Sequence, residues 1–571
     1  MKLCKLTIKN FRGLKGDQNI INFEDSNIIF LIGQNDIGKS TFLKAYEFFV
    51  NSKQKAEKSD FYNYDESNNI EIIGEFLKED FDEQNEEFSS KEPDWIDKWV
   101  NPETNRIVIK KVWDKADKTF TKYTYNPSYD VKDFVKNGFG GLDSLFTKYA
   151  PEPIFINALE TIESFEKKVN DIIEKDYLKK IEDRFAAEYK EAFDKITQLQ
   201  RKITGSDDVL DYNEKISRRF NNIFPELTLK IEQKDEEGID VIKAFKGNHS
   251  VNVVKEGIER KENINQHGHG IIRQALFNFI AFLKNDTSSN RKQYLILFEE
   301  PELFMHPKAS RSLRKELYDL VEDSPFQILC ATHSPIMVDI SKPHSSLVRV
   351  IKDENEYTKT YQVGHNIFQS EENKDYVQMI NRFNPYVCEV FYSDEVILVE
   401  GDTEAIVFRY ILDKYYSDRD IYVLNTGSKN NMIFYQKILT HFSIKHHVVH
   451  DRDDMFNKVG NINSAWTLNL RIWEQVVMSN QVAYDGISRR YVHDSNFESA
   501  HPAYTLDTTK GKPLSAYEYA KTLTIDDDVQ CIKIIKDIME NQAIVHDMDY
   551  VESLVESTAE NEQILNIRLY R

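Results

Sequence analysis

A glycine-rich octapeptide near the N-terminus is the feature that most constrains the fold. Residues 33–40 read Gly-Gln-Asn-Asp-Ile-Gly-Lys-Ser and fit the pattern G-x4-G-K-[ST] without a mismatch. An apolar strand is expected over Ile28–Ile32 directly before the octapeptide, and a helix directly after it. In that setting the N–H groups of the loop and the positive end of the helix bind phosphate. The octapeptide therefore predicts an α/β nucleotide-binding domain at the start of the chain.

The side chains of this loop have expected roles toward ATP. Lys39 is expected to reach the β- and γ-phosphates, and the Ser40 hydroxyl is expected to bind Mg²⁺. The expected ATP-binding residues of the loop are Gly33, Gln34, Asn35, Asp36, Ile37, Gly38, Lys39, Ser40 and Thr41.

A second apolar strand, Tyr294–Phe298, ends in an acidic string that suits the same site. Glu299 is expected to hold Mg²⁺ through water, and Glu300 is expected to activate the attacking water. Farther along, strand Phe326–Cys330 leads into Ala-Thr-His-Ser-Pro, whose His333 is expected to sense the γ-phosphate. These motifs together predict a nucleotide-hydrolysing site.

Length, charge, cysteine content and hydropathy exclude several classes of protein. The 571 residues suffice for about four domains. The net charge of −21 is the wrong sign for a chain that coats nucleic acid with its whole surface, so nucleic-acid binding requires a local basic track. Four widely separated cysteines argue against a disulfide framework or a cysteine-based zinc site. No run is apolar enough to span a membrane and no signal peptide is recognisable, so a cytoplasmic location is expected.

A second set of carboxylates follows two apolar strands in the C-terminal half of the chain. Strand Val396–Val399 ends in Glu400-Gly401, and Glu404 lies in the helix that begins there. About fifty residues later, strand Val448–His450 ends in Asp451-Arg452-Asp453. Alternate strand residues point the same way, and hard cations prefer oxygen ligands. The pattern predicts a site for divalent metal ions.

Histidines and paired basic residues near this motif leave alternatives open. His441, His446, His447 and His450 lack the H-x3-H spacing and the cysteine companions of zinc sites, so we expect them to line or flank a strand. Of these, His450 is a candidate for substrate contact. The candidates for phosphate contacts, or for plain surface charges, are Arg106, Lys110, Lys111, Arg489 and Arg490.

Four motifs within the first 335 residues resemble a known group of ATPases. Asn-Phe-Arg-Gly at 10–13, the phosphate loop, Phe-Glu-Glu-Pro-Glu at 298–302 and Ala-Thr-His-Ser-Pro at 331–335 look like the ABC-type ATPase heads of the RecF, SMC and OLD group. The resemblance adds Arg12 to the ATP-binding residues. It also implies that two heads sandwich ATP, so that a homodimer or higher homo-oligomer forms and a signature loop completes the partner's site. The candidate signature loop, Gly268-His269-Gly270, departs from the usual L-S-G-G-Q because it has no serine or glutamine.

The C-terminal motifs resemble a Toprim domain. An ABC-type head followed by a Toprim domain is the arrangement of the OLD (overcoming lysogenization defect) nuclease family, to which the Gabija nuclease subunit and retron-associated nucleases are similar. The resemblance implies two divalent metal ions, Mg²⁺ or Mn²⁺, and cleavage of phosphodiester bonds. The metal ligands that it implies are Glu400, Glu404, Asp451, Asp453 and, from a later acidic motif, Glu498. It implies a late catalytic lysine as well, for which Lys512 is the first choice and Lys521 the second.

The expected fold is therefore α/β, an ABC-type ATPase head with a helical dimerisation insertion, followed by a Toprim domain. We assign residues 1–160 and 226–345 to the head, 161–225 to the insertion, 346–388 to a connection and 389–571 to the Toprim domain. Apolar residues at helical spacing over Phe165–Ile203 suggest a long amphipathic helix that either dimerises or folds back on its own domain. Strands are expected at 227–232 and 241–245, and a helix from about Ile271.

The leading functional hypothesis is an ATP-regulated, metal-dependent DNA endonuclease in anti-phage defence. Two alternatives are a RecF/SMC-like ATP-driven DNA-binding or repair protein and a nucleotide-sensing subunit that gates a partner effector. The expected partners are DNA, a second copy of the chain, and a defence partner that is either helicase-like or a reverse transcriptase with its DNA product. No membrane partner is expected.

Overall fold

The computed structural model describes most of the ATPase-like and Toprim-like parts of the chain. The described residues are 1–78, 99–128, 132–136, 149–159, 252–254, 261–263, 269–282, 293–353, 355–363, 385–481, 488–493 and 496–540, with single positions between 146 and 198. The chain divides into two compact units, one formed by Met1–Ala158 with Thr287–Arg571 and the other by Leu159–Asp286. The expected helix Phe165–Ile203 and the expected strands at 227–232 and 241–245 lie outside the described residues, apart from single positions of that helix.

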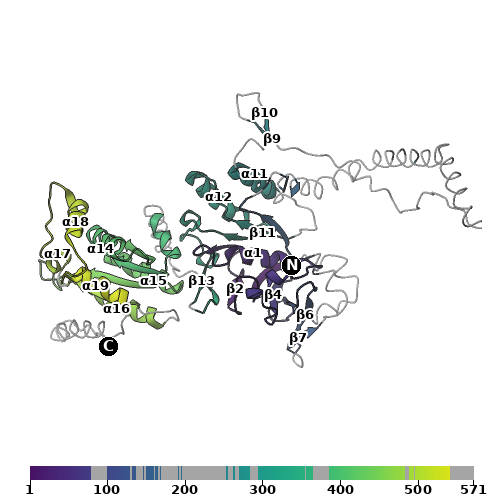
Figure 1. Ribbon diagram of the computed structural model, residues 1–571, viewed down its shortest axis with the longest axis horizontal. Coiled ribbons are helices and arrows are strands. Elements are labelled where there is room, and N and C mark those ends of the chain that lie inside the picture. Colours follow the sequence, from purple (N-terminus) through teal and green to yellow (C-terminus); the bar gives the residue numbers. More distant parts are fainter. Residues whose placement is uncertain are drawn as a thin grey trace, which may run out of the picture. The chain divides into compact units, whose positions relative to one another are not determined.

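A six-stranded sheet with mostly parallel strands carries the phosphate loop (Figure 1). Its order is β14-β13-β3-β12-β11-β8, and only β13 and β14 pair antiparallel. These strands are β3 (Ile28–Ile32), β8 (Glu152–Ile156), β11 (Tyr294–Glu299), β12 (Phe326–Ala331), β13 (Leu347–Lys352) and β14 (Thr358–Gln362). Every residue of β3 and β12 is buried, as continuous apolar runs in parallel sheets require. The three strands expected before the phosphate loop, the acidic string and the Ala-Thr-His-Ser-Pro motif are confirmed.

A second six-stranded sheet is antiparallel and has the order β2-β1-β4-β5-β6-β7. Its strands are β1 (Lys2–Lys9), β2 (Asn19–Asn22), β4 (Ile70–Leu77), β5 (Arg106–Trp113), β6 (Thr121–Asn126) and β7 (Asp133–Lys136). Buried and half-buried residues alternate along β4 and β5, because one face of this sheet packs on the core. Helix α1 (Lys39–Val50) contributes Phe42, Tyr46 and Phe49 to a core shared with both sheets. This packing holds the helix directly behind the phosphate loop.

The segment 346–388 is more than the connection that was expected there. It contributes β13 and β14, and β13 pairs with β3 through Leu347, Val348 and Arg349. The sheet that carries the phosphate loop therefore continues at least to Gln362. The short apolar stretch Leu347–Ile351 was overlooked because polar residues surround it on both sides.

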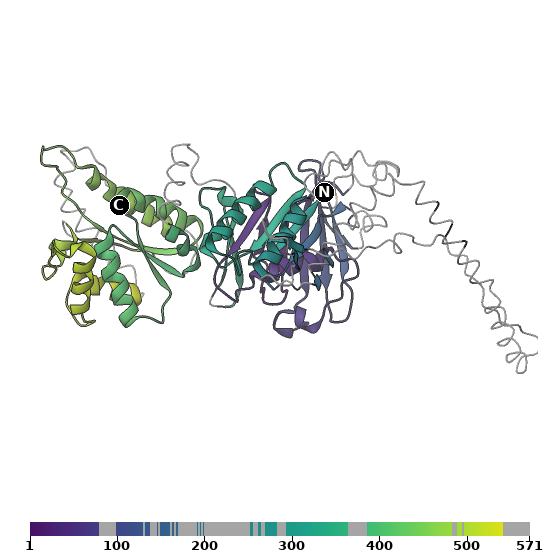
Figure 2. The same cartoon turned by 90° about the horizontal axis from the view of Figure 1, so that it is seen from above.

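A four-stranded parallel sheet forms the core of the C-terminal part, in the order β16-β15-β17-β18. Its strands are β15 (Glu395–Val399), β16 (Ile421–Asn425), β17 (Lys445–Asp451) and β18 (Arg490–His493). The helices of this part are α14 (Asp402–Tyr415), α15 (Lys429–His441), α16 (Ser464–Gln481), α17 (Phe497–Ala500), α18 (Gly511–Thr522) and α19 (Gln530–Glu540). Figure 2 shows helices on both faces of the sheet, and α14, α18 and α19 share one apolar core with β15. Covered in this way, the strands can present side chains only at their ends.

The remaining elements are few among the described residues. Helix α12 (Pro307–Leu320) links β11 to β12, while α11 (His269–Phe282) and the hairpin of β9 (Asn252–Val254) and β10 (Lys261–Asn263) belong to the smaller unit. Short 3-10 helices are Lys58–Asp60, Tyr62–Tyr64, Pro335–Met337, His344–Ser346 and Pro385–Tyr392. The helix expected from about Ile271 is confirmed by α11. Among the described helices, none combines the length and the apolar character that crossing a bilayer demands.

Candidate functional site

The phosphate loop makes a tight turn between β3 and α1 that only glycine can complete. Gly33 has φ of 145° and Gly38 has φ of 97°, both in the region that favours glycine. A β-carbon on Gly33 would lie 2.4 Å from Ile37 Cδ1 and 2.5 Å from the carbonyl oxygen of Val350. Gln34, Asn35 and Asp36 are exposed at the tip of the loop, and Ile37, Gly38, Ser40 and Thr41 are half-buried. The loop therefore has the open backbone that phosphate binding requires.

The side chain of Lys39 folds back over this loop. Its ammonium donates hydrogen bonds to the carbonyl oxygens of Gly33 at 2.8 Å and Gln34 at 2.5 Å. Burial lowers the pKa of Lys39 to about 8, although the carboxylates of Glu300 and Glu302 act in the opposite direction. The acidic residues after β11 are therefore close enough to Lys39 to form one electrostatic site with it.

The acidic residues and His333 meet at the carboxyl ends of β11 and β12. The N–H of Glu300 donates to the carbonyl oxygen of Ala331 at 2.7 Å, which holds the two strand ends together. His333 Nδ1 lies 3.3 Å from Glu300 Oε1. Glu299, the last residue of β11, accepts a hydrogen bond from the N–H of Ala158 at 3.4 Å. The structure thus brings Glu299, Glu300 and His333 to one edge of the sheet, as the sequence predicted.

Glu302 is a further member of this group that the sequence analysis did not select. Its Oε1 accepts a hydrogen bond from the Thr332 hydroxyl at 2.7 Å, and its buried Oε2 has no hydrogen-bond partner among the described residues. Burial raises the pKa of Glu302 above its usual value. The Glu-Glu-Pro-Glu string contained the signal, since its fourth residue returns to the same strand end after one turn.

Arg12 and the candidate signature loop remain predictions as ATP-site residues. Arg12 has φ of 52°, and its Nε donates to Asp60 Oδ1 at 2.9 Å, which holds the guanidinium in place. His269 is exposed and Gly270 buried at the start of α11, while Gly268 lies outside the described residues. Both described residues belong to the smaller compact unit.

The second site lies at the carboxyl edge of the four-stranded sheet. Glu400 follows β15, Asp451 ends β17 and His493 ends β18. Asp451 is the register partner of His493, and its N–H donates to Glu400 Oε2 at 3.4 Å. Glu404 lies in the first turn of α14, where its carboxylate accepts a hydrogen bond from the N–H of Gly401 at 2.9 Å. Parallel strands and the helix that follows one of them therefore gather these side chains at one edge.

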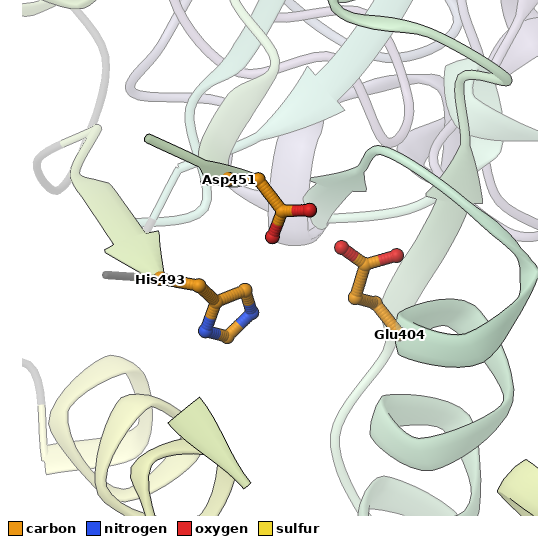
Figure 3. A group of neighbouring side chains, drawn as sticks. All are labelled: Glu404, Asp451 and His493. Carbon is orange, nitrogen blue, oxygen red and sulfur yellow. The ribbon is translucent and has the colours of Figure 1, made fainter. Parts of the chain in front are cut away.

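Glu404, Asp451 and His493 point toward a common centre, as Figure 3 shows. One ligand atom from each of the three lies within 4.8 Å of the others. Glu404 is 4% exposed and His493 is fully buried. Asp451 Oδ1 and His493 Nε2 are buried without a hydrogen-bond partner among the described residues. Carboxylate and imidazole atoms that converge in this way can hold a metal ion.

The carboxylates of this site raise one another's pKa. Burial, followed by the charges of Glu404 and Glu400, raises the pKa of Asp451 to about 8. Burial and the charge of Glu400 raise the pKa of Glu404 to about 7, with a smaller effect from Glu498. The pKa of Glu400 is raised mainly by burial. Several buried carboxylates that repel one another favour a bound cation, because its charge offsets the repulsion.

Asp453 has a cationic partner that the sequence analysis missed. The buried ammonium of Lys429 donates to the carboxylate of Asp453 and, at 3.0 Å, to Asn469 Oδ1. Burial lowers the pKa of Lys429, while Asp453 and Glu400 act in the opposite direction. Lys429 begins α15 without any recognisable motif around it, so only the packing of α15 beside β17 brings it to the site.

The later predicted residues lie on exposed surfaces. Glu498 is exposed in the first turn of α17, within electrostatic reach of Glu404. Lys512 is exposed in the first turn of α18, and its side chain takes part in no hydrogen bond or ion pair with the described residues. Lys521, the second choice, lies over the ring of Tyr517 with Nζ 4.5 Å from the ring centroid. The roles assigned to these three residues stay predictions.

Several basic residues and histidines lie deeper than expected. Arg489 and Arg490 are buried, so the prediction of surface or phosphate contacts is wrong for both of them. Arg489 pairs with Asp537 at 3.0 Å, and Arg490 Nε donates to His450 Nε2 at 2.9 Å. The idea that His450 contacts substrate is wrong too, since its ring is buried and bonded at both nitrogens. His446, His447 and His450 all lie in β17, which confirms the expectation that these histidines line a strand.

Two regions of the chain match known families. Residues 1–338 match the AAA ATPase domain, and residues 391–453 match the TOPRIM domain of proteins like the overcoming lysogenization defect protein. The first region contains the phosphate loop and the residues after β11 and β12. The second contains four predicted metal ligands, which are Glu400, Glu404, Asp451 and Asp453.

Three known nucleases are similar to most of the chain. The Old nuclease of Escherichia phage P2 is 26% identical over 475 residues, which cover 80% of this chain and 78% of that protein. The endonuclease GajA of Bacillus cereus (strain VD045) is 24% identical over 441 residues, 75% of this chain and 70% of that protein. The endonuclease GajA of Bacillus cereus (strain HuB5-5) is 22% identical over 616 aligned positions, 88% of this chain and 87% of that protein. The similarity therefore extends over more of the chain than either matched family region alone.

Proposed function

The chain belongs to the OLD family, with an AAA ATPase domain followed by an OLD-like Toprim domain, and we propose that it is an ATP-regulated, metal-dependent DNA endonuclease. Endonuclease function is a property of the similar proteins at the level of the family. For this chain we propose hydrolysis of phosphodiester bonds in DNA, as nicks or double-strand breaks, in defence against phage.

One observation carries the proposal, namely the buried convergence of Glu404 and Asp451 beside Glu400. Asp451 Oδ1 is buried without a hydrogen-bond partner among the described residues, so its position suits a cation better than a structural role. Glu400, Glu404 and Asp451 would hold the ions, together with the predicted ligands Asp453 and Glu498. When bound, two divalent ions, Mg²⁺ or Mn²⁺, would activate water and stabilise the leaving 3′-oxygen. Lys512 is assigned the task of offsetting charge on the pentavalent phosphate, with Lys521 as the second choice.

The ATPase site is proposed to control this nuclease. Lys39 and Ser40 would bind the phosphates and Mg²⁺, while Glu299 would orient the same ion through water. Glu300 would take the proton of the attacking water, and His333, 3.3 Å from Glu300, would sense the γ-phosphate. The signature loop Gly268-His269-Gly270 of a second copy would complete the site, so the working form is proposed to be a homodimer or a higher homo-oligomer.

The proposed partners besides DNA are a helicase-like protein, or a reverse transcriptase with its DNA product. Either would supply the trigger that converts nucleotide state into cleavage. Their genes are expected beside the gene for this chain, which a comparison of genomic neighbourhoods would test.

Cleavage of supercoiled plasmid tests the proposal directly. The purified protein is incubated with plasmid in Mg²⁺ or Mn²⁺, with and without ATP, beside Asp451→Ala and the control Asp454→Ala, whose side chain is exposed. We expect the wild type and Asp454→Ala to nick or linearise the plasmid and Asp451→Ala to leave it intact. Equal cleavage by Asp451→Ala would place the chemistry elsewhere and refute the assignment. Absence of cleavage by the wild type in every condition, including those with candidate partners added, would refute the endonuclease proposal.

A further inference from the structure

The edge of the four-stranded sheet places a histidine among carboxylates that the family resemblance did not include. His493 ends β18, and its register partner is Asp451 at the end of β17. Its imidazole faces Asp451 and Glu404 (Figure 3), and one ligand atom from each residue lies within 4.8 Å of the others. His493 has no role in the sequence-based predictions, because it precedes the acidic motif that supplies Glu498 and no ligand pattern includes it.

The hydrogen bonds behind the ring determine which nitrogen faces the carboxylates. Gln530 Nε2 donates to the carbonyl oxygen of Val492 at 3.0 Å, so the amide oxygen of Gln530 faces His493 Nδ1, also at 3.0 Å. An amide oxygen can only accept, which requires the proton of the neutral imidazole to lie on Nδ1. The lone pair is therefore on Nε2, the nitrogen that metal ions bind.

The ring is also held in one orientation. Phe497 meets it edge-on, with ring centroids 5.3 Å apart at 89°, and His501 lies at the same centroid distance at 74°. Nε2 is buried and has no hydrogen-bond partner among the described residues. A histidine that served only as packing would leave this acceptor unsatisfied, which is unfavourable in a buried place. Side chains locked in this manner are typical of a prepared ligand site.

We propose that His493 Nε2 binds the same divalent ion as Glu404 and Asp451, and that this nitrogen makes the site prefer Mn²⁺ to Mg²⁺. The proposal rests on the proposed function, since it concerns the metal site of the nuclease. The chemical reason is the donor set. Mg²⁺ takes oxygen ligands and keeps its waters, whereas first-row transition ions accept imidazole nitrogen readily. A neutral imidazole nitrogen in place of a neutral oxygen ligand therefore shifts the metal preference of the site without changing its charge.

Metal binding to the full-length protein, in the absence of nucleotide and DNA, tests the proposal. Affinities for Mn²⁺ are measured by electron paramagnetic resonance of the free ion, and affinities for Mg²⁺ by competition. The variants are His493→Gln, which exchanges the nitrogen for an amide oxygen, Asp451→Ala, and the control His441→Ala, an exposed histidine of α15. We expect His493→Gln to weaken Mn²⁺ binding at least about 10-fold while Mg²⁺ binding changes less than about 3-fold, so that the preference for Mn²⁺ collapses.

The outcomes separate this inference from the proposed function. If Asp451→Ala loses Mn²⁺ and His493→Gln keeps the wild-type preference, the nitrogen is not a ligand, although the carboxylate site stands. If Asp451→Ala binds Mn²⁺ as the wild type does, the metal site of the proposed function fails. If a variant does not fold, pulsed electron paramagnetic resonance of the wild-type protein with bound Mn²⁺ takes the place of the binding measurement. The Mn²⁺ signal that Asp451→Ala lacks should carry the nitrogen coupling of a bound imidazole, and a signal without that coupling would overturn the proposal.

Discussion

Replacement of Asp451 by asparagine should stabilise the metal-free protein while it abolishes metal binding. Burial and the neighbouring carboxylates raise the pKa of Asp451 from 3.8 to about 8. Between these values the folded chain holds a proton that the unfolded chain has lost, so stability falls as the pH rises through this range. Asparagine has no proton to lose, and its amide can donate to the nearby carboxylates.

The size of this effect follows from the pKa. Each pH unit between the unfolded-state pKa of 3.8 and pH 7 contributes about 1.4 kcal/mol. The largest possible gain in the free energy of unfolding at pH 7 is therefore about 4 kcal/mol. Asp451 is partly exposed and shares its repulsion with Glu404, so we expect a gain of about 1–3 kcal/mol at pH 7. That gain corresponds to a rise in melting temperature of about 2–6 °C.

Thermal melting in excess chelator measures the effect. Asp451→Asn should melt at a higher temperature than the wild type at pH 7.5. The difference should shrink at pH 5, because protonation of Asp451 in the folded wild type costs less free energy at that pH. The control Asp454→Asn, at an exposed position, should melt with the wild type at both pH values. Addition of Mn²⁺ should raise the melting temperature of the wild type and leave Asp451→Asn unchanged. A variant that melts at or below the wild type at pH 7.5 would refute the argument that the carboxylates repel one another.

Three further predictions concern the ATPase domain and the core of the Toprim domain. Lys39→Ala should weaken ATP binding at least about 10-fold, because the variant loses the ammonium group that is expected to bind the phosphates. An unchanged ATP affinity in equilibrium dialysis would contradict the assignment of residues 33–40 as a phosphate-binding loop. Gly33→Ala should lower both the melting temperature and the ATP affinity, because the added β-carbon would lie 2.5 Å from the carbonyl oxygen of Val350. A variant that melts and binds ATP like the wild type would show that the backbone of the turn can relax to accept the β-carbon. Arg489→Ala should destabilise the fold by about 3–5 kcal/mol, because it leaves Asp537 without its buried partner, and wild-type stability in urea would show that the pair is not needed.

Much of both sites could be predicted because the residues concerned are close in sequence. The octapeptide that ends in Lys39 and Ser40 contains the whole phosphate loop, and the strand before it is a continuous apolar run. Glu400 and Asp451 each follow such a run, so their positions at strand ends could be expected from hydropathy alone. Strand ends in a parallel sheet lie on one edge, which made the convergence of these residues predictable as well.

Other parts of the site depend on partners far away in sequence. His493 enters the metal site because β18 pairs beside β17, and Lys429 enters because α15 packs along the same strand. Neither residue is itself part of a motif, since the acidic motif that supplies Glu498 begins after His493 and a lone histidine or lysine is common on any surface. For the same reason the pair Arg489-Arg490 resembled surface charge, although Asp537 and His450 satisfy it in the interior.

The sequence by itself determined the two chemical motifs, their order and the α/β class, because those depend on backbone periodicity and on ligands spaced a few residues apart. Only the tertiary structure decided which atoms share a site. It set the burial that raises the pKa of Asp451, the network that presents Nε2 of His493, and the pairing of Asp453 with Lys429. The physical reason is that strand register, helix packing and desolvation are properties of the assembled chain, and no local stretch of residues contains them.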